Sequence, residues 1–164
     1  MTISKLLLWL FVINLGIALG AGLYEGRIVV PRWLQAEGST LHWNAEAAVT
    51  DDTGRRFWAF VTTGPLTLLV IANLILALRA PDALRPWWLA AAGFGLADRI
   101  FTFSYFIPRM LRLMRTADSP EAVARASQWA NLNYVRHALV LLALLAALRT
   151  FALVYQYSAS SGAT

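Results

Sequence analysis

The sequence predicts an all-α integral membrane protein, a four-helix bundle with two longer connections on one side. Two observations carry this prediction. Hydrophobic residues make up 59% of the 164 residues and charged residues only 14%, whereas soluble domains average about 45–50% and about 25%. The apolar residues also fall in four long runs, and roughly 20 such residues suffice for a helix to cross a bilayer core of about 30 Å. We therefore expect one four-span domain, with spans at about 6–30, 57–78, 86–107 and 129–155.

The first span carries only Asn14 among its apolar residues before it reaches Tyr24 and Glu25. A signal peptide is the alternative, because Lys5 precedes the run and small residues follow it. The run is long for a signal peptide, however. Small and polar residues recur at helical spacing along it, which suits a helix packed inside a bundle.

The second span, Phe57 to Leu78, has no charged residue, and a short link around Pro81 leads to the third. The third span is apolar except for Asp98 and Arg99 near its middle. The fourth span contains three basic residues, Arg136, His137 and Arg149. Its helix is expected to begin outside the membrane, since Ser119-Pro120-Glu121 has the order of an N-cap, a first helical residue and a first-turn acid.

The two long connections are amphipathic. The connection 31–56 is aromatic and ends in the capping cluster Asp51-Asp52-Thr53, and the segment 109–115 is a basic amphipathic stretch expected to lie on lipid headgroups. Tryptophans near the span ends are expected to form aromatic belts at the two interfaces. They are Trp9, Trp87 and Trp88 on one side, and Trp33, Trp58 and Trp129 on the other.

The positions of the basic residues predict the orientation. Eight arginines flank the long connections, against four basic residues on the side of the termini and the short link. The positive-inside rule then places the long connections in the cytoplasm and the termini outside, in a bacterial inner membrane. The net charge of +5 indicates no nucleic-acid partner, because no basic run is interleaved with exposed aromatic residues. The chain has no cysteine, which excludes disulfides and thiolate metal sites.

The ionisable residues inside the spans are candidates for a site, since burying a charge without a partner is costly. Counted from the side of the long connections at 1.5 Å per residue, Glu25 lies roughly 7 Å deep, Arg136 and His137 roughly 10–12 Å, and Asp98 and Arg99 roughly 12–14 Å. All the deep charges therefore fall in one half of the membrane. Other polar or aromatic residues reach the same level at helical spacing. They are Trp58 and Thr62 on the second span, Thr102 and Tyr105 on the third, and Trp129 and Asn133 on the fourth.

Two alternatives stay open at this stage. Glu25, Asp98, Arg99 and Arg136 are two acids and two bases, so they can neutralise one another as purely structural ion pairs. His42 and His137 with a carboxylate would make a two-histidine metal set, although no ligand motif supports it. We expect no resident cofactor. The expected partners are the lipid bilayer and a lipophilic small molecule. Homo-oligomerisation through the small-residue face 90–93 competes with simple lipid contact.

The start of the fourth span, with Trp129, Leu132, Asn133 and Arg136, resembles the W-x-x-L-N-x-x-R signature of the anthrone oxygenase-like family of small four-helix membrane proteins. The glycine-rich first helix that ends in Pro31 and the third helix that runs into Pro108 are similar to that family as well. The resemblance implies that O₂ is a co-substrate and that an anthrone- or quinone-like aromatic compound is oxidised. Family membership alone does not establish this chain's reaction.

Such a reaction without a cofactor requires a base for the ring methylene proton, positive charge for the resulting phenolate, and a dry cavity. His137, Asp98 or Glu25 is the candidate base, and Arg136 the candidate oxyanion stabiliser. The residues expected to orient or stack on the rings are Asn133, Trp129, Trp58 and Tyr105. The competing interpretation is a non-enzymatic carrier or accessory subunit. A carrier is expected to show inverted repeats or broken helices, and the sequence shows neither.

Overall fold

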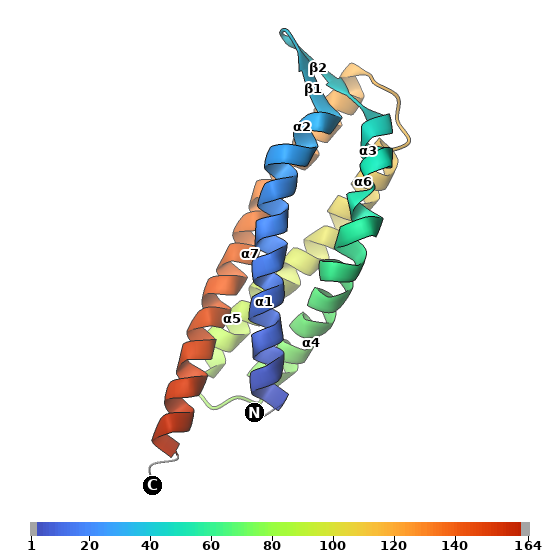
Figure 1. The fold of residues 1–164 in the computed structure, drawn as a ribbon. Helices are drawn as coiled ribbons and strands as arrows, with labels where there is room; N and C mark the ends of the chain where they lie inside the picture. Colours follow the sequence, from blue (N-terminus) through green and yellow to red (C-terminus); the bar gives the residue numbers. More distant parts are fainter. Residues whose placement is uncertain (1–2, 162–164) are drawn as a thin grey trace.

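The computed structural model describes residues 3–161 as four helical segments packed lengthwise, with a small hairpin at one end (Figure 1). The first segment comprises α1 (Ile3–Tyr24), the π-helical η1 (Glu25–Val29) and α2 (Val30–Trp33). The second comprises η2 (Gly54–Thr63) and α4 (Gly64–Leu78). The third comprises α5 (Arg85–Phe101), η3 (Thr102–Phe106) and α6 (Ile107–Leu113), and the fourth is α7 (Pro120–Ser161). Strands β1 (Leu34–Glu37) and β2 (Thr40–Trp43) and helix α3 (Ala45–Asp51) connect the first two segments.

The all-α class predicted from the sequence is confirmed. Among the described residues, three helices are long and apolar enough to cross a membrane: Ile3–Trp33, Gly54–Leu78 and Pro120–Tyr157. The third helical segment, which carries Asp98 and Arg99, is not among them. The start of α1, the end of α7 and the short link lie at one end of the molecule, and both long connections lie at the other (Figure 1). We call the latter the hairpin end.

Two helices extend beyond the prolines at which the sequence pattern ended them. The first segment continues through Pro31 to Trp33, and the third continues through Pro108 to Leu113. A proline inside a helix removes one hydrogen bond and crowds the carbonyl four residues earlier. Here Pro31, Pro65 and Pro108 each stand second in an α-helix that directly follows a π-helical segment. In all three cases a wider π turn precedes the proline ring, and the helix continues past the proline.

The connection 31–56 contains a β-hairpin that the sequence analysis did not predict. The two strands pair antiparallel from Leu34 with Trp43 to Glu37 with Thr40, and Gly38 at the turn has a φ of 60°, which favours glycine. Asn44 then begins α3, because its side-chain Oδ1 accepts a hydrogen bond of 2.8 Å from the Ala47 N–H. Strands of four residues are too short to give an alternating pattern that stands out from an amphipathic connection.

Three clusters of apolar residues make the core, one at each end of the bundle and one between them. At the middle cluster α4 and α5 pack closely, because a Cβ on Gly95 would lie 2.9 Å from Cγ2 of Val70. The cluster at the hairpin end contains Trp33, Trp43 and Trp129, and it holds the hairpin and α3 against the third and fourth segments.

Several tryptophans predicted to form interface belts are interior residues. Trp33, Trp88 and Trp129 are buried, and their indole N–H groups donate to the Asp51 carboxylate, the Asn73 side chain and a backbone carbonyl. The belt prediction was wrong for these three, because their position along the span fixes only their height and not the direction in which they point. Trp9 and Trp87 are exposed, as that prediction requires.

Candidate functional site

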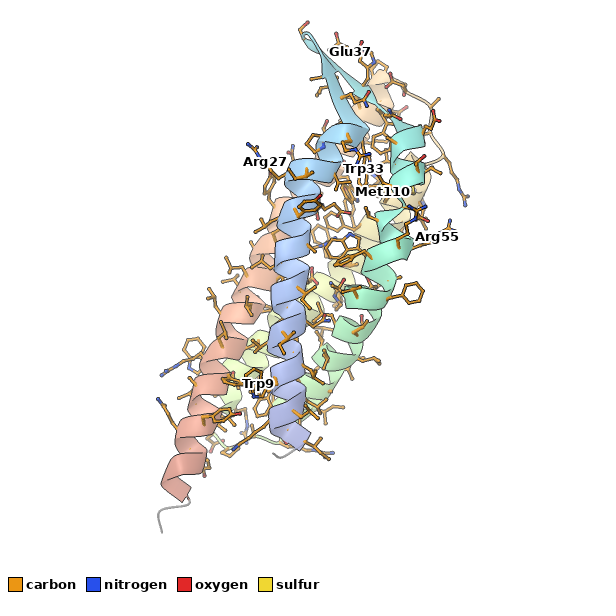
Figure 2. All side chains as sticks on the ribbon, viewed as in Figure 1. Trp9, Arg27, Trp33, Glu37, Arg55 and Met110 are labelled. Atoms are coloured by element: carbon orange, nitrogen blue, oxygen red, sulfur yellow. The ribbon has the colours of Figure 1, made fainter. Side chains whose placement is uncertain are left out.

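A cavity of about 330 Å³ lies at the hairpin end of the bundle. All four helical segments contribute to it, and its walls are mostly apolar and aromatic. Figure 2 shows Trp33 and Met110 reaching into the interior at this end, with Arg55 on the outside. The lining residues are Glu25, Trp33, Asp52, Thr53, Gly54, Arg55, Trp58, Ala59, Thr62, Thr63, Arg99, Thr102, Phe106, Ile107, Met110, Leu111, Met114, Trp129 and Arg136.

The three π-helical segments surround this cavity. Glu25 opens η1, Trp58 and Thr62 belong to η2, and Thr102 opens η3, and all four line the cavity. A π turn has one residue more than an α turn, and such turns occur frequently at functional sites. In three of the four helical segments, the π-helical turns therefore contain residues that line the cavity.

Glu25 is the carboxylate of the cavity. Its Oε1 accepts two hydrogen bonds from the second segment and the loop before it, one of 2.6 Å from Thr53 Oγ1 and one of 2.8 Å from Trp58 Nε1. The side chain is buried, with 6% of its surface exposed. Two donors on one oxygen fix the position of the carboxylate at the cavity wall.

Arg136 is the central cation of the site. Its guanidinium carbon lies 5.3 Å from the ring centre of Trp58 and 5.1 Å from that of Phe106, both within the range of a cation–π interaction. Its Nε lies 3.7 Å from Oδ1 of Asp98, an ion pair rather than a hydrogen bond. The aromatic rings hold the cation at the cavity wall while the carboxylate behind it supplies the opposite charge.

Asp98 and Arg99 form a second pair in the same region. Arg99 Nε donates to Asp98 Oδ2 over 2.9 Å, and its Nη2 also contacts this oxygen. Asp98 is fully buried and does not line the cavity, so one interior carboxylate serves both Arg99 and Arg136. Arg99 Nη1 is buried and has no hydrogen-bond partner among the described residues.

Other buried polar atoms of the third and fourth segments also lack partners within the described part of the chain. A buried donor or acceptor left without a partner costs about 1–3 kcal/mol, so a group of them between two helices indicates a place where polar atoms of a ligand or of water bind. The atoms in this region are Thr102 Oγ1, Tyr105 Oη, both side-chain polar atoms of Asn133, Arg136 Nε, and Nδ1 and Nε2 of His137.

The structure brings six of the ten residues proposed from the sequence to the cavity wall: Glu25, Trp58, Thr62, Thr102, Trp129 and Arg136. The other four are Asp98, Tyr105, Asn133 and His137, and they do not line it. His137 is buried against the first segment, where a Cβ added to Gly22 would lie 2.6 Å from its Nε2. Consecutive helical residues point about 100° apart, so Arg136 faces the cavity and His137 faces α1.

Several lining residues were not predicted from the sequence. Thr53 was recognised only as part of a capping cluster, and Met110 and Met114 only as part of a surface helix, yet all three line the cavity. Trp33 was expected at the interface. The signal that was available is the heptad-like recurrence of apolar residues from Phe106 to Leu113, which marks a buried face continuing beyond Pro108.

His42 lies far from His137 in the fold. It belongs to β2, and its Nδ1 lies 2.7 Å from Oδ2 of Asp118 in the loop before α7. Within residues 3–161, no three histidine, aspartate or glutamate side chains gather as a metal site requires. The two-histidine set considered from the sequence does not assemble in this structure.

Comparison with protein-family models, with curated proteins and with solved structures gives no match to the chain. The resemblance carried by Trp129, Leu132, Asn133 and Arg136 therefore stays a prediction.

Proposed function

We propose that this chain is a four-span membrane protein with an oxygenase-like activity on a lipophilic aromatic compound of the anthrone or quinone type. One observation carries the proposal. A single, largely apolar cavity presents a hydrogen-bonded carboxylate, Glu25, together with a guanidinium, Arg136, that is held against aromatic rings. A flat phenolic molecule needs both groups if it is to lose a proton and hold the resulting charge.

The membrane part of the proposal rests on the packing of the third segment. Three helices are long and apolar enough to cross a bilayer, and α5 packs along both α4 and α7. The charges that interrupt its apolar run, Asp98 and Arg99, are buried against each other and do not face outward. A helix with its charges paired inside a bundle can cross a membrane at low cost, so we place α5 across the bilayer as well. We place the hairpin end in the cytoplasm because arginine is in excess at that end, and we propose that the membrane is a bacterial inner membrane.

Glu25 is the proposed base, because it is the one of the three candidate bases that lines the cavity. It takes one proton from the ring methylene, and Arg136 stabilises the phenolate that forms. O₂ then adds to the ring carbon, and loss of water from the resulting peroxide leaves a carbonyl group. The balance is one substrate plus one O₂ giving one quinone plus one water, with two C–H bonds broken and one C=O bond formed. Asp98 positions Arg136 and does not touch the substrate.

The test uses purified protein in detergent supplied with anthrone, with O₂ consumption and quinone absorbance followed together. We expect Glu25→Gln to slow the reaction by about 100-fold or more, the usual contribution of a general base, and Arg136→Gln to slow it by a similar factor. Glu37→Gln in the exposed hairpin and Arg27→Gln on the exposed face of η1 are the matched controls, and both should keep the wild-type rate. A wild-type rate equal to that of empty micelles contradicts the proposal.

A second candidate function has one observation in its favour. Asp98, fully buried and shared by two arginines, has the arrangement of a structural ion-pair network. In a non-enzymatic binder or accessory subunit, the cavity takes the same class of molecule without turnover. Quenching of the intrinsic tryptophan fluorescence by anthraquinone, without O₂ consumption from anthrone, distinguishes this function from the enzymatic one.

A further inference from the structure

A second hollow, which we call the lateral groove, lies between α4 and the α5–η3 part of the third segment and measures about 480 Å³. Its walls are almost wholly apolar. Ile71 on α4, Ile100 on α5 and Phe103 on η3 line it and are themselves exposed, so the groove opens on the outer surface of the bundle and not toward the hairpin end.

One end of the groove is closed by close helix packing. Val70 meets Gly95 there, at a distance that leaves no room for a Cβ on the glycine. Arg99 lies one helical turn further along α5, and the third segment passes into the wider η3 shortly after it. The groove therefore begins where tight packing ends and leads directly to Arg99.

Arg99 lines both the lateral groove and the hairpin-end cavity. Its side chain is buried, with 6% exposed, and two of its nitrogens are occupied by Asp98. The third, Nη1, is a buried donor without a partner among the described residues. A guanidinium nitrogen donates and never accepts, so the group that completes this site must carry a hydrogen-bond acceptor, such as a carbonyl oxygen.

The depth of Arg99 limits the source of that oxygen. Arg99 lies roughly 21 Å along the helix from Arg85, at 1.5 Å per residue, within the hydrocarbon region of a bilayer about 30 Å thick. The ester carbonyls of phospholipids stay at the interface. On the side of the lateral groove, which faces the hydrocarbon, an acceptor oxygen at this depth belongs to a molecule dissolved in the membrane interior, and the apolar walls require the rest of that molecule to be apolar.

We propose that the lateral groove is a second binding site, open to the bilayer, for a lipophilic molecule that carries a carbonyl oxygen, with Arg99 Nη1 as the hydrogen-bond donor. Arg99 also lines the hairpin-end cavity, so one side chain belongs to the walls of both hollows. The inference rests on the proposed membrane insertion. It does not rest on the oxygenase-like reaction.

The test uses full-length protein in lipid nanodiscs with 4-dodecylbenzophenone, a diaryl ketone whose carbonyl is both the proposed acceptor and the photoreactive centre. After irradiation, adducts are located by mass spectrometry. We expect them to concentrate on Ile100, Phe103 and Ser104 of the groove. Leu68 and Phe60, which are at least as exposed on the second segment but line neither hollow, serve as references for contact with bulk lipid. Equal labelling of groove and reference residues overturns the proposal.

A matched pair of competitors tests the carbonyl oxygen. Dodecylfluorenone and dodecylfluorene have nearly the same shape, and only the first has an acceptor. We expect the ketone to compete about tenfold better, the difference expected for one hydrogen bond to a charged donor. Equal competition by the two compounds shows that Arg99 takes no part and overturns the proposal.

Two variants distinguish the loss of binding in the groove from the loss of folding. Arg99→Met removes the donor, but it also unbalances Asp98 and can prevent folding. Ser104→Phe fills the groove from its exposed side and leaves the Arg99–Asp98 pair intact. We expect it to lower groove labelling about tenfold, while Leu68→Phe, which places the same aromatic ring on the outer surface away from the groove, leaves labelling unchanged. Unchanged labelling in Ser104→Phe overturns the proposal. O₂ consumption is measured separately, so labelled protein without turnover refutes only the proposed reaction.

Discussion

The pairing of Arg136 with Asp98 makes each of these residues costly to remove singly. Arg136 contacts Trp58 and Phe106 through its guanidinium, and Asp98 is shared with Arg99. Arg136→Met leaves Asp98 with one cation, and breaking a buried pair costs about 3–5 kcal/mol. We therefore expect a large fall in the unfolding free energy, measured in mild detergent.

The double variant Asp98→Asn with Arg136→Met is the control for that prediction. It removes both charges, so it should be clearly more stable than the sum of the two single changes implies. If the losses simply add, Asp98 and Arg136 are not coupled and the ion pair has no energetic role.

Gly22 gives a second prediction, which concerns packing alone. A methyl group at this position meets the His137 ring at 2.6 Å, whereas Gly20, on the same helix, has nothing within 4 Å of an added Cβ. We expect Gly22→Ala to lower stability by about 1–3 kcal/mol through overpacking, and Gly20→Ala to be neutral or to stabilise by up to about 1 kcal/mol. Thermal unfolding of the two variants checks this. Equal melting temperatures would show that His137 does not lie against α1.

Among the elements, the hairpin is attached to the loop before α7 through two contacts of Asp118. Asp118 Oδ2 lies 2.7 Å from His42 Nδ1, and its Oδ1 accepts from the Trp43 backbone N–H over 2.8 Å. The hydrogen bond to Asp118 raises the pKa of His42 above its ordinary value of 6.5. The Trp43 backbone N–H, followed by His42, lowers the pKa of Asp118 below its ordinary value of 3.8.

The pH dependence of this attachment follows from the directions of the two pKa shifts. The contribution of His42 is fully present below pH 6.5 and is lost as the pH rises through its raised pKa. The contribution of Asp118 is present above pH 3.8 and is lost as the pH falls through its lowered pKa. The protection of the hairpin amides, which is the exchange rate corrected for its intrinsic pH dependence, should therefore be greatest between these limits and fall on both sides, and Asp118→Asn should abolish this pH dependence of the protection. A flat profile in the wild type contradicts the prediction.

At the same scale, local sequence signals predicted some elements well and others not at all. The start of α7 at Pro120 was predicted, and the Ala122 N–H donates to Ser119 Oγ over 3.1 Å, as an N-cap requires. The continuations through Pro31 and Pro108 were not predicted, because a proline ends most helices and the π turns that accommodate it have no known sequence pattern. The hairpin was not predicted, because its strands of four residues are too short to show a clear alternating pattern.

For the site, the sequence predicted how deep each residue lies along its span, but not the direction in which its side chain points. Counting residues from the span ends placed Glu25, Thr102 and Arg136 at one level, and the structure brings all three to one cavity. The same count could not tell that Asp98 turns away from the cavity and that His137 faces α1. Direction depends on how each helix is rotated in the bundle, which the side-chain packing of all four segments determines together.

At the scale of the whole molecule, the proposed orientation can be tested directly, because the chain has no cysteine. A single Ser39→Cys lies in the exposed hairpin turn, and a single Asp82→Cys lies in the exposed link before α5. In intact bacterial cells with a permeabilised outer membrane, a membrane-impermeant maleimide should label Asp82→Cys and leave Ser39→Cys unlabelled until the inner membrane is disrupted. The reverse pattern would invert the orientation, and labelling of both from outside would rule out the four-span topology.

The π-helical segments also affect how the chain would align with relatives. Each π turn takes in one residue more than an α turn, and all downstream residues of that helix are rotated by about 100° relative to an uninterrupted α-helix. Met110 and Met114, which line the cavity, lie downstream of η3. A homologous helix that lacks the extra residue would align to this chain only with a one-residue gap near 25–29 or 102–106, so gap positions in an alignment would mark which relatives preserve this cavity.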